Sequence, residues 1–99
     1  MGVPSPSSRP DPVAPDGQHL MTISHQGRFW DIYLELENDG GPGNPYRGRL
    51  AYSPADRAED EFTLRTIPVI VEATRDDALR RAYQLEGHQF VAFLRSLLP

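Results

Sequence analysis

The sequence contains neither cysteine nor lysine, and it has no long hydrophobic run. Without cysteine there are no disulfide bonds and no thiolate metal sites. A membrane-spanning helix needs a run of about 18 apolar residues, and none is present. The N-terminus also lacks the basic and apolar regions of a secretory signal. Together these absences predict a cytoplasmic protein that does not partner with a membrane.

The charge balance is acidic. The net charge is −4, and all ten basic residues are arginine. An acidic chain has no global electrostatic attraction to nucleic acid or to an anionic membrane. With 99 residues it forms at most one domain, which is too small to spare core for a large internal cavity. We therefore expect any functional site to lie on the surface, at a sheet edge or between subunits.

Residues 1–18 form a proline-rich segment that holds five of the ten prolines and almost no large apolar side chains. Such a segment cannot bury enough surface to offset the entropy lost on ordering. We predict a disordered tail over residues 1–18 and a single small domain over residues 19–99. A solvated leader is the simpler interpretation of the tail. The other is that its spaced prolines dock into an aromatic groove as a polyproline II helix.

Residues 28–37 alternate between apolar and polar positions. The even positions carry Trp30, Ile32, Leu34 and Leu36, and the odd positions carry Phe29, Asp31, Tyr33, Glu35 and Glu37. Side chains alternate across a strand with a period of two, whereas the helical period of 3.6 would scatter the apolar set. The pattern predicts a strand with one buried face and one solvated face.

Residues 19–26 are predicted to form the preceding strand of a hairpin. Gln26-Gly27 suits a two-residue turn because glycine accepts the positive φ that such turns require. This turn places Ile23 opposite Trp30 on the apolar face. It leaves Leu20 on the opposite, outward face. The turn and the apolar pattern agree on one register.

Residues 46–53 are predicted to form the third strand, after a loop rich in chain breakers. In an antiparallel arrangement Arg47 and Arg49 face the row that holds Glu35 and Glu37. Opposite charges at cross-strand positions stabilise a sheet by about 0.2–1 kcal/mol per pair. Structural support is therefore a sufficient explanation for these arginines.

Residues 61–72 are predicted to form the fourth strand, whose alternation breaks near Pro68. Proline donates no ladder hydrogen bond, so this part of the strand belongs at an edge or a bulge. The apolar run Val69-Ile70-Val71 indicates a segment covered from two sides or an edge that meets another chain. Upstream, Ser53-Pro54 has the pattern of a helix start, and we expect one or two helical turns there.

Residues 75–97 have the periodicity of a helix that begins at a capping box on Thr74. Its apolar stripe consists of Leu79, Ala82, Tyr83, Phe90, Phe93, Leu94 and Leu97. Glu86 would fall inside this stripe, and Gly87 costs about 1 kcal/mol in a helix interior, so we expect a kink or break there. The predicted fold is α+β: a four-stranded antiparallel meander with the C-terminal helix packed on one face.

No catalytic or metal-binding motif is present, such as a nucleophile elbow or a phosphate-binding loop. His19 and His25 lie about 20 Å apart on an extended strand, so they do not share a metal ion. Asp31, Glu35 and Glu37 stand in a row, but a solvated charged face explains them without any chemistry. We predict that the protein is not an enzyme and that it has no cofactor and no metal.

The outward sheet face combines aromatic side chains with arginine, as surfaces that stack single-stranded nucleic acid do. Phe29 and Tyr33 share this face with Arg47, Arg49 and the nearby Arg65. Four antiparallel strands followed by a helix also resemble the topology of the PUR and whirly single-strand-binding proteins. That resemblance implies nucleic-acid binding through the outer sheet face. The acidic residues on the same face and the acidic total argue against it.

Our leading hypothesis is a non-catalytic interaction module that binds a protein partner or forms a homodimer. A small domain with apolar residues on two faces often covers the second face with a partner. The candidate partner-binding residues are Leu20, Phe29, Tyr33, Arg47, Arg49, Val69 and Val71. Binding of single-stranded nucleic acid through the outer sheet face is the alternative hypothesis.

Overall fold

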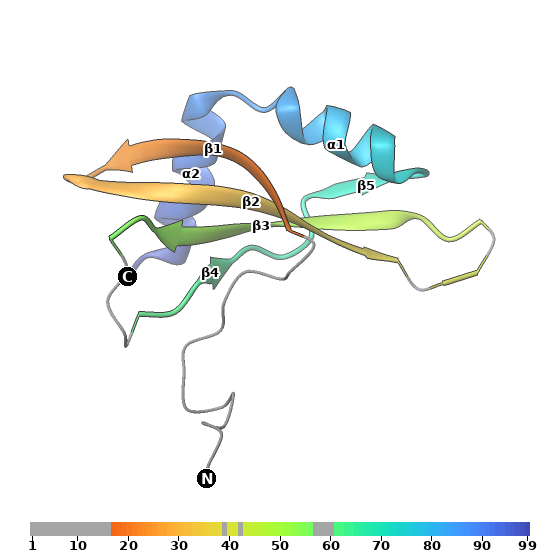
Figure 1. Cartoon of the computed structure of the whole chain (residues 1–99), viewed down its shortest axis with the longest axis horizontal. Helices are drawn as coiled ribbons and strands as arrows, with labels where there is room; N and C mark the ends of the chain where they lie inside the picture. The colour runs from red at the N-terminus through yellow and green to blue at the C-terminus, as the bar shows by residue number, and fades with distance from the viewer. Residues whose placement is uncertain (1–16, 39, 42, 57–60) are drawn as a thin grey trace, which may run out of the picture.

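The computed structural model describes residues 17–38, 40–41, 43–56 and 61–99. The elements are β1 (Gln18–His25), β2 (Arg28–Asn38), β3 (Tyr46–Pro54), β4 (Leu64–Arg65), β5 (Ile70–Glu72), α1 (Arg75–Tyr83) and α2 (Gly87–Leu97). The antiparallel sheet has the order β1-β2-β3-β4, and β5 also pairs with β3 (Figure 1). The predicted α+β class and antiparallel meander are confirmed. Most of the predicted tail, residues 1–16, lies outside the described residues.

The β1–β2 hairpin has the predicted turn and register. Gln26 and Gly27 form the turn with φ angles of 52° and 78°. Positive φ at both central residues is what a type I′ turn requires, and this turn matches the twist of the flanking strands. Ile23 lies opposite Trp30, as predicted. Because the side-chain period is two, this register places the whole apolar set of β2 on one face.

A β-bulge at Leu20 changes the face that the start of β1 presents. His19 pairs with Tyr33 but Met21 pairs with Ile32, so β1 contains one extra residue at this point. As a result Leu20 and Met21 both pack against the core. The prediction that Leu20 points outward is wrong, because it assumed an uninterrupted alternation along the strand.

Strand β3 pairs with β2 along its whole length. The register places Glu35 opposite Arg49 and Glu37 opposite Arg47, as expected. The helix start predicted at Ser53-Pro54 is wrong, because both residues belong to β3.

Pro54 ends β3 opposite Trp30, and the Ala55 N–H donates to the Phe29 carbonyl at 2.9 Å. Proline lacks an N–H, so it fits the end of a strand as readily as the start of a helix. Pairing with β2 therefore outweighs the local capping signal. Residues 57–60, where the predicted helix would continue, lie outside the described part of the chain.

The predicted fourth strand, residues 61–72, is divided into β4 and β5. Both pair with β3, and the interval between them contains Pro68. At the break the Thr66 N–H donates to the Leu50 carbonyl, and the Leu50 N–H donates to the Thr66 hydroxyl, each at 3.0 Å. The Thr66 side chain thus takes over one ladder bond where the backbone departs from strand geometry. The single continuous strand was a wrong prediction, although the disturbance at proline was expected.

The C-terminal region forms two helices, and the predicted break near Gly87 is confirmed. Thr74 caps α1 as predicted, since its Oγ1 accepts from the Asp77 N–H at 3.1 Å. Glu86 precedes α2 as its N-cap, and its N–H donates to Gln89 Oε1 at 2.8 Å. The break therefore removes Glu86 from the apolar stripe that it would have interrupted.

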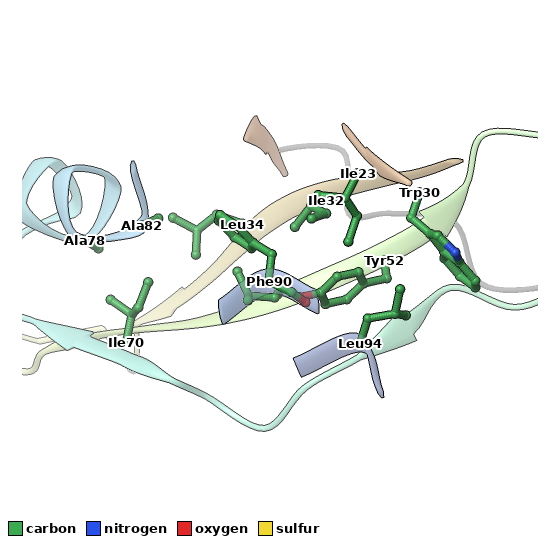
Figure 2. Packing of buried hydrophobic residues seen from close by; sticks show 11 residues of the cluster. Ile23, Trp30, Ile32, Leu34, Tyr52, Ile70, Ala78, Ala82, Phe90 and Leu94 are labelled. Carbon is green, nitrogen blue, oxygen red and sulfur yellow. The ribbon is translucent and has the colours of Figure 1, made fainter. Parts of the chain in front are cut away.

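The core lies between the helices and the face of the sheet that carries Trp30, Ile32 and Leu34. Figure 2 shows Trp30 at one end of this cluster, beyond Tyr52 and Leu94, with Ala78 and Ala82 of α1 at the other end. The buried residues are Ile23, Trp30, Ile32, Leu34, Leu50, Tyr52, Ile70, Ala78, Ala82, Phe90 and Leu94.

Tyr83 does not belong to the buried stripe, contrary to prediction. It is 57% exposed, and α1 instead buries Ala78 and Ala82, one turn apart. Because α1 is a separate helix, its orientation is set by packing against β5 and β3 rather than by continuity with α2.

Candidate functional site

The outer sheet face, opposite the face on which α1 and α2 pack, is covered by charged side chains that bind one another. Arg65 Nε lies 2.8 Å from Glu35 Oε1, and Arg65 also donates to Glu35 Oε2 at 3.2 Å. Arg49 forms an ion pair with Glu37, although the residue directly opposite Arg49 on β2 is Glu35. Glu35 is only 7% exposed although it lies on the open face. These arginines serve first to neutralise buried or crowded carboxylates.

The other end of this face is also internally bonded. The Thr22 hydroxyl donates to Asp31 Oδ1 at 2.6 Å, and His19 Nε2 lies 3.4 Å from the same oxygen. The His19 ring packs edge-on against Tyr33 with 5.2 Å between centroids. Tyr33 is half-buried, whereas Phe29 is 61% exposed. Four strand positions separate the two aromatics by about 13 Å, so they form no continuous stacking platform.

The predicted partner-binding residues do not form one surface. Phe29, Tyr33, Arg47, Arg49 and Val71 lie on the outer face, where Val71 pairs with Arg47 on β3.

The other two predicted residues lie elsewhere. Val69 is on the helix side of the sheet beside Phe93 and Leu97, and Leu20 packs against the core. The exposed apolar side chains of the helix side are therefore a separate candidate surface.

The β1–β2 turn, the end of β3 and the C-terminus lie at one end of the sheet (Figure 1). A cleft of about 400 Å³ lies among residues of these segments. We call it the Trp30 cleft; its lining residues are His25, Gln26, Arg28, Trp30, Pro54, Glu61, Phe62, Leu64 and Leu98. Residues of the β1–β2 hairpin form one wall of the cleft, and residues 61–64, which lead into β4, form the other. Phe62 stands at the rim and is 64% exposed.

Arg28 holds the two walls of the Trp30 cleft together. Its guanidinium donates to both oxygens of Glu61 at 2.6 Å and to Asp56 Oδ1 at 3.1 Å. It also lies 5.5 Å from the centroid of the Trp30 ring, within the range of a cation–π contact. The hydrogen bonds to Glu61, and then those to Asp56, raise the pKa of this guanidinium. The bidentate pair fixes the backbone next to Phe62, so the exposed ring is presented from an anchored position.

Trp30 forms the buried end of the cleft with 6% of its surface exposed. Its indole Nε1 is covered and has no hydrogen-bond partner among the residues that the structure describes. A buried tryptophan N–H usually finds a partner, and an unsatisfied donor costs about 1–3 kcal/mol. Trp30, which lines the cleft, therefore carries a donor that is buried and unpaired among the described residues.

A second apolar hollow of about 300 Å³ lies on the same helix side, which we call the Ile67 groove. It is lined by Thr66, Ile67, Val69, Phe93, Ser96 and Leu97. Ile67 is 80% exposed, the highest value among the large apolar side chains described. Residues 61–69 contribute a wall to both hollows. The C-terminal half of α2 forms the other wall of the Ile67 groove, and Leu98, which follows α2, lines the Trp30 cleft.

Sequence reasoning missed both hollows. A continuous strand over residues 61–72 would place Phe62 and Ile67 on opposite faces of a regular ladder. The break between β4 and β5 instead leaves Ile67 beside α2, on the same side of the sheet as the cleft that Phe62 and Leu98 line. The disturbance at Pro68 was the available signal, but it did not show which side chains the break would expose.

Within the described ranges, no group of three or more His, Asp or Glu side chains is placed to hold a metal ion. No described helix is long and apolar enough to span a membrane. Comparisons with protein-family models, with curated proteins and with solved structures found no match to this chain. The function is therefore argued from the surfaces alone.

Proposed function

We propose that this protein is a non-catalytic interaction module that binds a protein partner through the Trp30 cleft and the Ile67 groove. The observation that carries the proposal is the pair of exposed apolar side chains on residues 61–69, namely Phe62 and Ile67. Each stands beside an apolar hollow, and residues 61–69 contribute a wall to both hollows.

The composition of this surface suits protein binding. Binding energy in protein interfaces concentrates in a few aromatic or apolar anchors that are surrounded by polar residues. Phe62 is such an anchor, and the ion-paired Arg28 and Glu61 supply a polar rim next to it. Since Arg28 already holds the segment in place, little ordering entropy is lost on binding. The outer face lacks this arrangement because its charged groups are committed to one another.

The proposal is tested by selecting displayed random peptides on the full chain and measuring their affinity for variants. Phe62→Ser removes the anchor, and we expect affinity to fall about tenfold or more. Phe29→Ser is the matched control, because it removes a ring of nearly equal exposure from the outer face. Failure to enrich any peptide, or a loss caused by Phe29→Ser instead, would contradict binding at the cleft.

Single-stranded nucleic-acid binding stays as the second proposal, supported by the exposed Phe29 on a face that also holds Arg47 and Arg49. It requires that stacking and phosphate contacts compete with the existing ion pairs. Titration with a short oligonucleotide at low salt should then shift amides of β2 and β3. Raising the salt, or substituting Phe29→Ala, should reverse the shifts. A spectrum unchanged by the oligonucleotide would eliminate this proposal.

A further inference from the structure

Strand β1 forms one edge of the sheet, and among the described residues it pairs with β2 alone (Figure 1). The opposite edge consists of β4 and β5, which are two and three residues long and are separated by Pro68. Short strands and proline protect a sheet edge from pairing with another chain. In contrast, β1 has eight residues and contains no proline. It is therefore the less protected of the two edges.

The backbone groups of Ser24 and Thr22 point away from β2. The N–H of Ala55, which follows β3, donates to the Phe29 carbonyl, so Phe29 directs its backbone groups away from its β1 partner Ser24. Hydrogen-bonded and non-hydrogen-bonded pairs alternate along an antiparallel ladder. Ser24–Phe29 and Thr22–Asp31 are therefore non-hydrogen-bonded pairs. The N–H and C=O groups of Ser24 and Thr22 point out from the edge, where no described residue accepts from them or donates to them.

The start of β1 is protected, so the open part of the edge is short. The Tyr83 hydroxyl donates to the His19 carbonyl at 3.4 Å, and the bulge at Leu20 disturbs the ladder next to it. A bulge and a covering side chain both hinder pairing with another chain. At its other end the strand stops at the hairpin turn. Pairing is therefore limited to residues 21–25.

Residues 21–25 are complementary to a second copy of themselves. An antiparallel copy with its Ile23 opposite Ile23 brings Thr22 opposite Ser24 of the partner, and Ser24 opposite the partner's Thr22. Both are then hydrogen-bonded pairs, so every outward N–H and C=O of Thr22 and Ser24 finds a partner. Threonine and serine side chains also hydrogen-bond to each other at such cross-strand positions. The same strand thus supplies both sides of the contact.

The charge distribution also fits a second copy at this edge. Each copy has a net charge of −4, so two copies repel each other where acidic surfaces meet. Among the described strands, β1 alone contains no arginine, aspartate or glutamate. Pairing through β1 therefore places no like charges directly opposite each other, an arrangement that would destabilise a sheet.

We propose that two copies of this chain pair through residues 21–25 of β1 and form a two-fold dimer with one continuous sheet. The same surface patch is used on both copies, so the contact is isologous and closed. The paired stretch is short, and we expect a weak dimer that forms at high micromolar concentration. Thr22 and Ser24 line neither the Trp30 cleft nor the Ile67 groove, so the inference does not depend on the proposed function.

Sedimentation equilibrium of the full chain tests the dimer. Lysine on an edge strand opposes pairing, so Ser24→Lys should raise the dissociation constant about tenfold or more. Ile67→Lys is the matched control, because it makes the same charge change at an exposed position of the Ile67 groove and should leave the constant unchanged. A wild-type chain that stays monomeric at millimolar concentration would overturn the proposal. So would a constant that rises in Ile67→Lys but not in Ser24→Lys.

Amide hydrogen exchange tests the pairing residue by residue. The amides of Thr22 and Ser24 should exchange about tenfold or more slowly above the dissociation constant than in dilute solution. The Ile23 amide is directed to β2, so it should be protected in both conditions, and its protection in Ser24→Lys would show that the hairpin of this variant is intact. Protection of Thr22 and Ser24 that does not change with concentration would mean that the chain covers its own edge, and would refute the dimer.

A mixture of two differently isotope-labelled chains tests the register. Ile23 faces itself in a non-hydrogen-bonded pair, in which the Cα atoms lie about 4.5 Å apart. We therefore expect a nuclear Overhauser contact between the Ile23 Hα atoms of the two copies. A dimer that lacks this contact would contradict the proposed pairing. Peptide binding that depends on Phe62 would be unaffected by that result, so the two proposals can fail separately.

Discussion

The Tyr52 hydroxyl connects α2 to the sheet. Its removal should destabilise the protein at neutral pH and stabilise it at alkaline pH. Tyr52 has no exposed surface, and its hydroxyl donates to the Phe90 carbonyl at 2.7 Å. Phe90 lies within α2, where its carbonyl also accepts the intrahelical bond from four residues later. Tyr52→Phe therefore removes one hydrogen bond without orphaning the carbonyl. At neutral pH it should lower the free energy of unfolding by about 0.5–1.5 kcal/mol.

At alkaline pH the same substitution should stabilise the protein. Burial raises the pKa of Tyr52 well above its ordinary value of about 10. Above about pH 10 the Tyr52 phenol loses its proton in the unfolded chain but keeps it in the folded chain. Stability is then lost by about 1.4 kcal/mol per pH unit until the folded pKa is reached. Phenylalanine does not titrate, so the variant lacks this contribution to the slope.

The two stability curves should therefore cross. Setting a hydrogen-bond loss of about 1 kcal/mol equal to the linkage free energy places the crossing at about pH 10.6. Losses of about 0.5 and 1.5 kcal/mol would place it near about pH 10.1 and pH 11.1. The chain has no lysine or cysteine to titrate in this window, and the other tyrosines are common to both proteins.

Urea unfolding at a series of pH values measures both curves. The difference in unfolding free energy between wild type and Tyr52→Phe should decline above about pH 10 and then change sign. Curves that remain parallel up to about pH 11.5 would refute the reasoning, because a phenol that ionises equally in both states is not buried as described.

Two further substitutions test the sheet. A Cβ on Gly48 would come within 2.9 Å of Leu34 Cδ1, so Gly48→Ala should lower the free energy of unfolding by about 1–3 kcal/mol. Gly87→Ala is the control, because a Cβ there meets no atom within 4 Å and should not lower the free energy of unfolding. Thermal or urea unfolding measures both variants, and equal losses in the two would contradict overpacking at Gly48. Arg65→Ala should lower the free energy of unfolding by about 1–3 kcal/mol, since the buried Glu35 loses two hydrogen bonds. A loss under about 0.5 kcal/mol would mean that the pair behaves as a surface ion pair.

Elements whose signals lie close together in the chain were predictable. The β1–β2 hairpin follows from Gln26-Gly27 and from an alternation that agrees with it, and Thr74 and Gly87 mark a helix start and a helix break. In each case the local conformation and the burial pattern demand the same structure. The cross-strand placement of Arg49 opposite Glu35 follows from the same alternation.

Where local signals conflicted with long-range pairing, prediction from sequence failed. Ser53-Pro54 has the local chemistry of a helix start, yet pairing with β2 extends β3 through both residues. The bulge at Leu20 leaves no mark in an apolar sequence such as Leu20-Met21, because either residue fits the core.

The candidate site could not be predicted from the sequence, because it depends on contacts between residues that are far apart in the chain. Trp30 was correctly predicted as a core residue, but its place in a cleft depends on Arg28 and Glu61, 33 positions apart in sequence. The hollow beside Ile67 depends on where the ladder breaks next to α2, and the cleft beside Phe62 depends on contact with the β1–β2 turn and Leu98. The sequence alone determined the β1–β2 hairpin and its turn, the cap at Thr74 and the break at Gly87, because backbone conformation and side-chain period are local properties. Tertiary structure decided the surface, since distant residues must meet before a hollow exists between them.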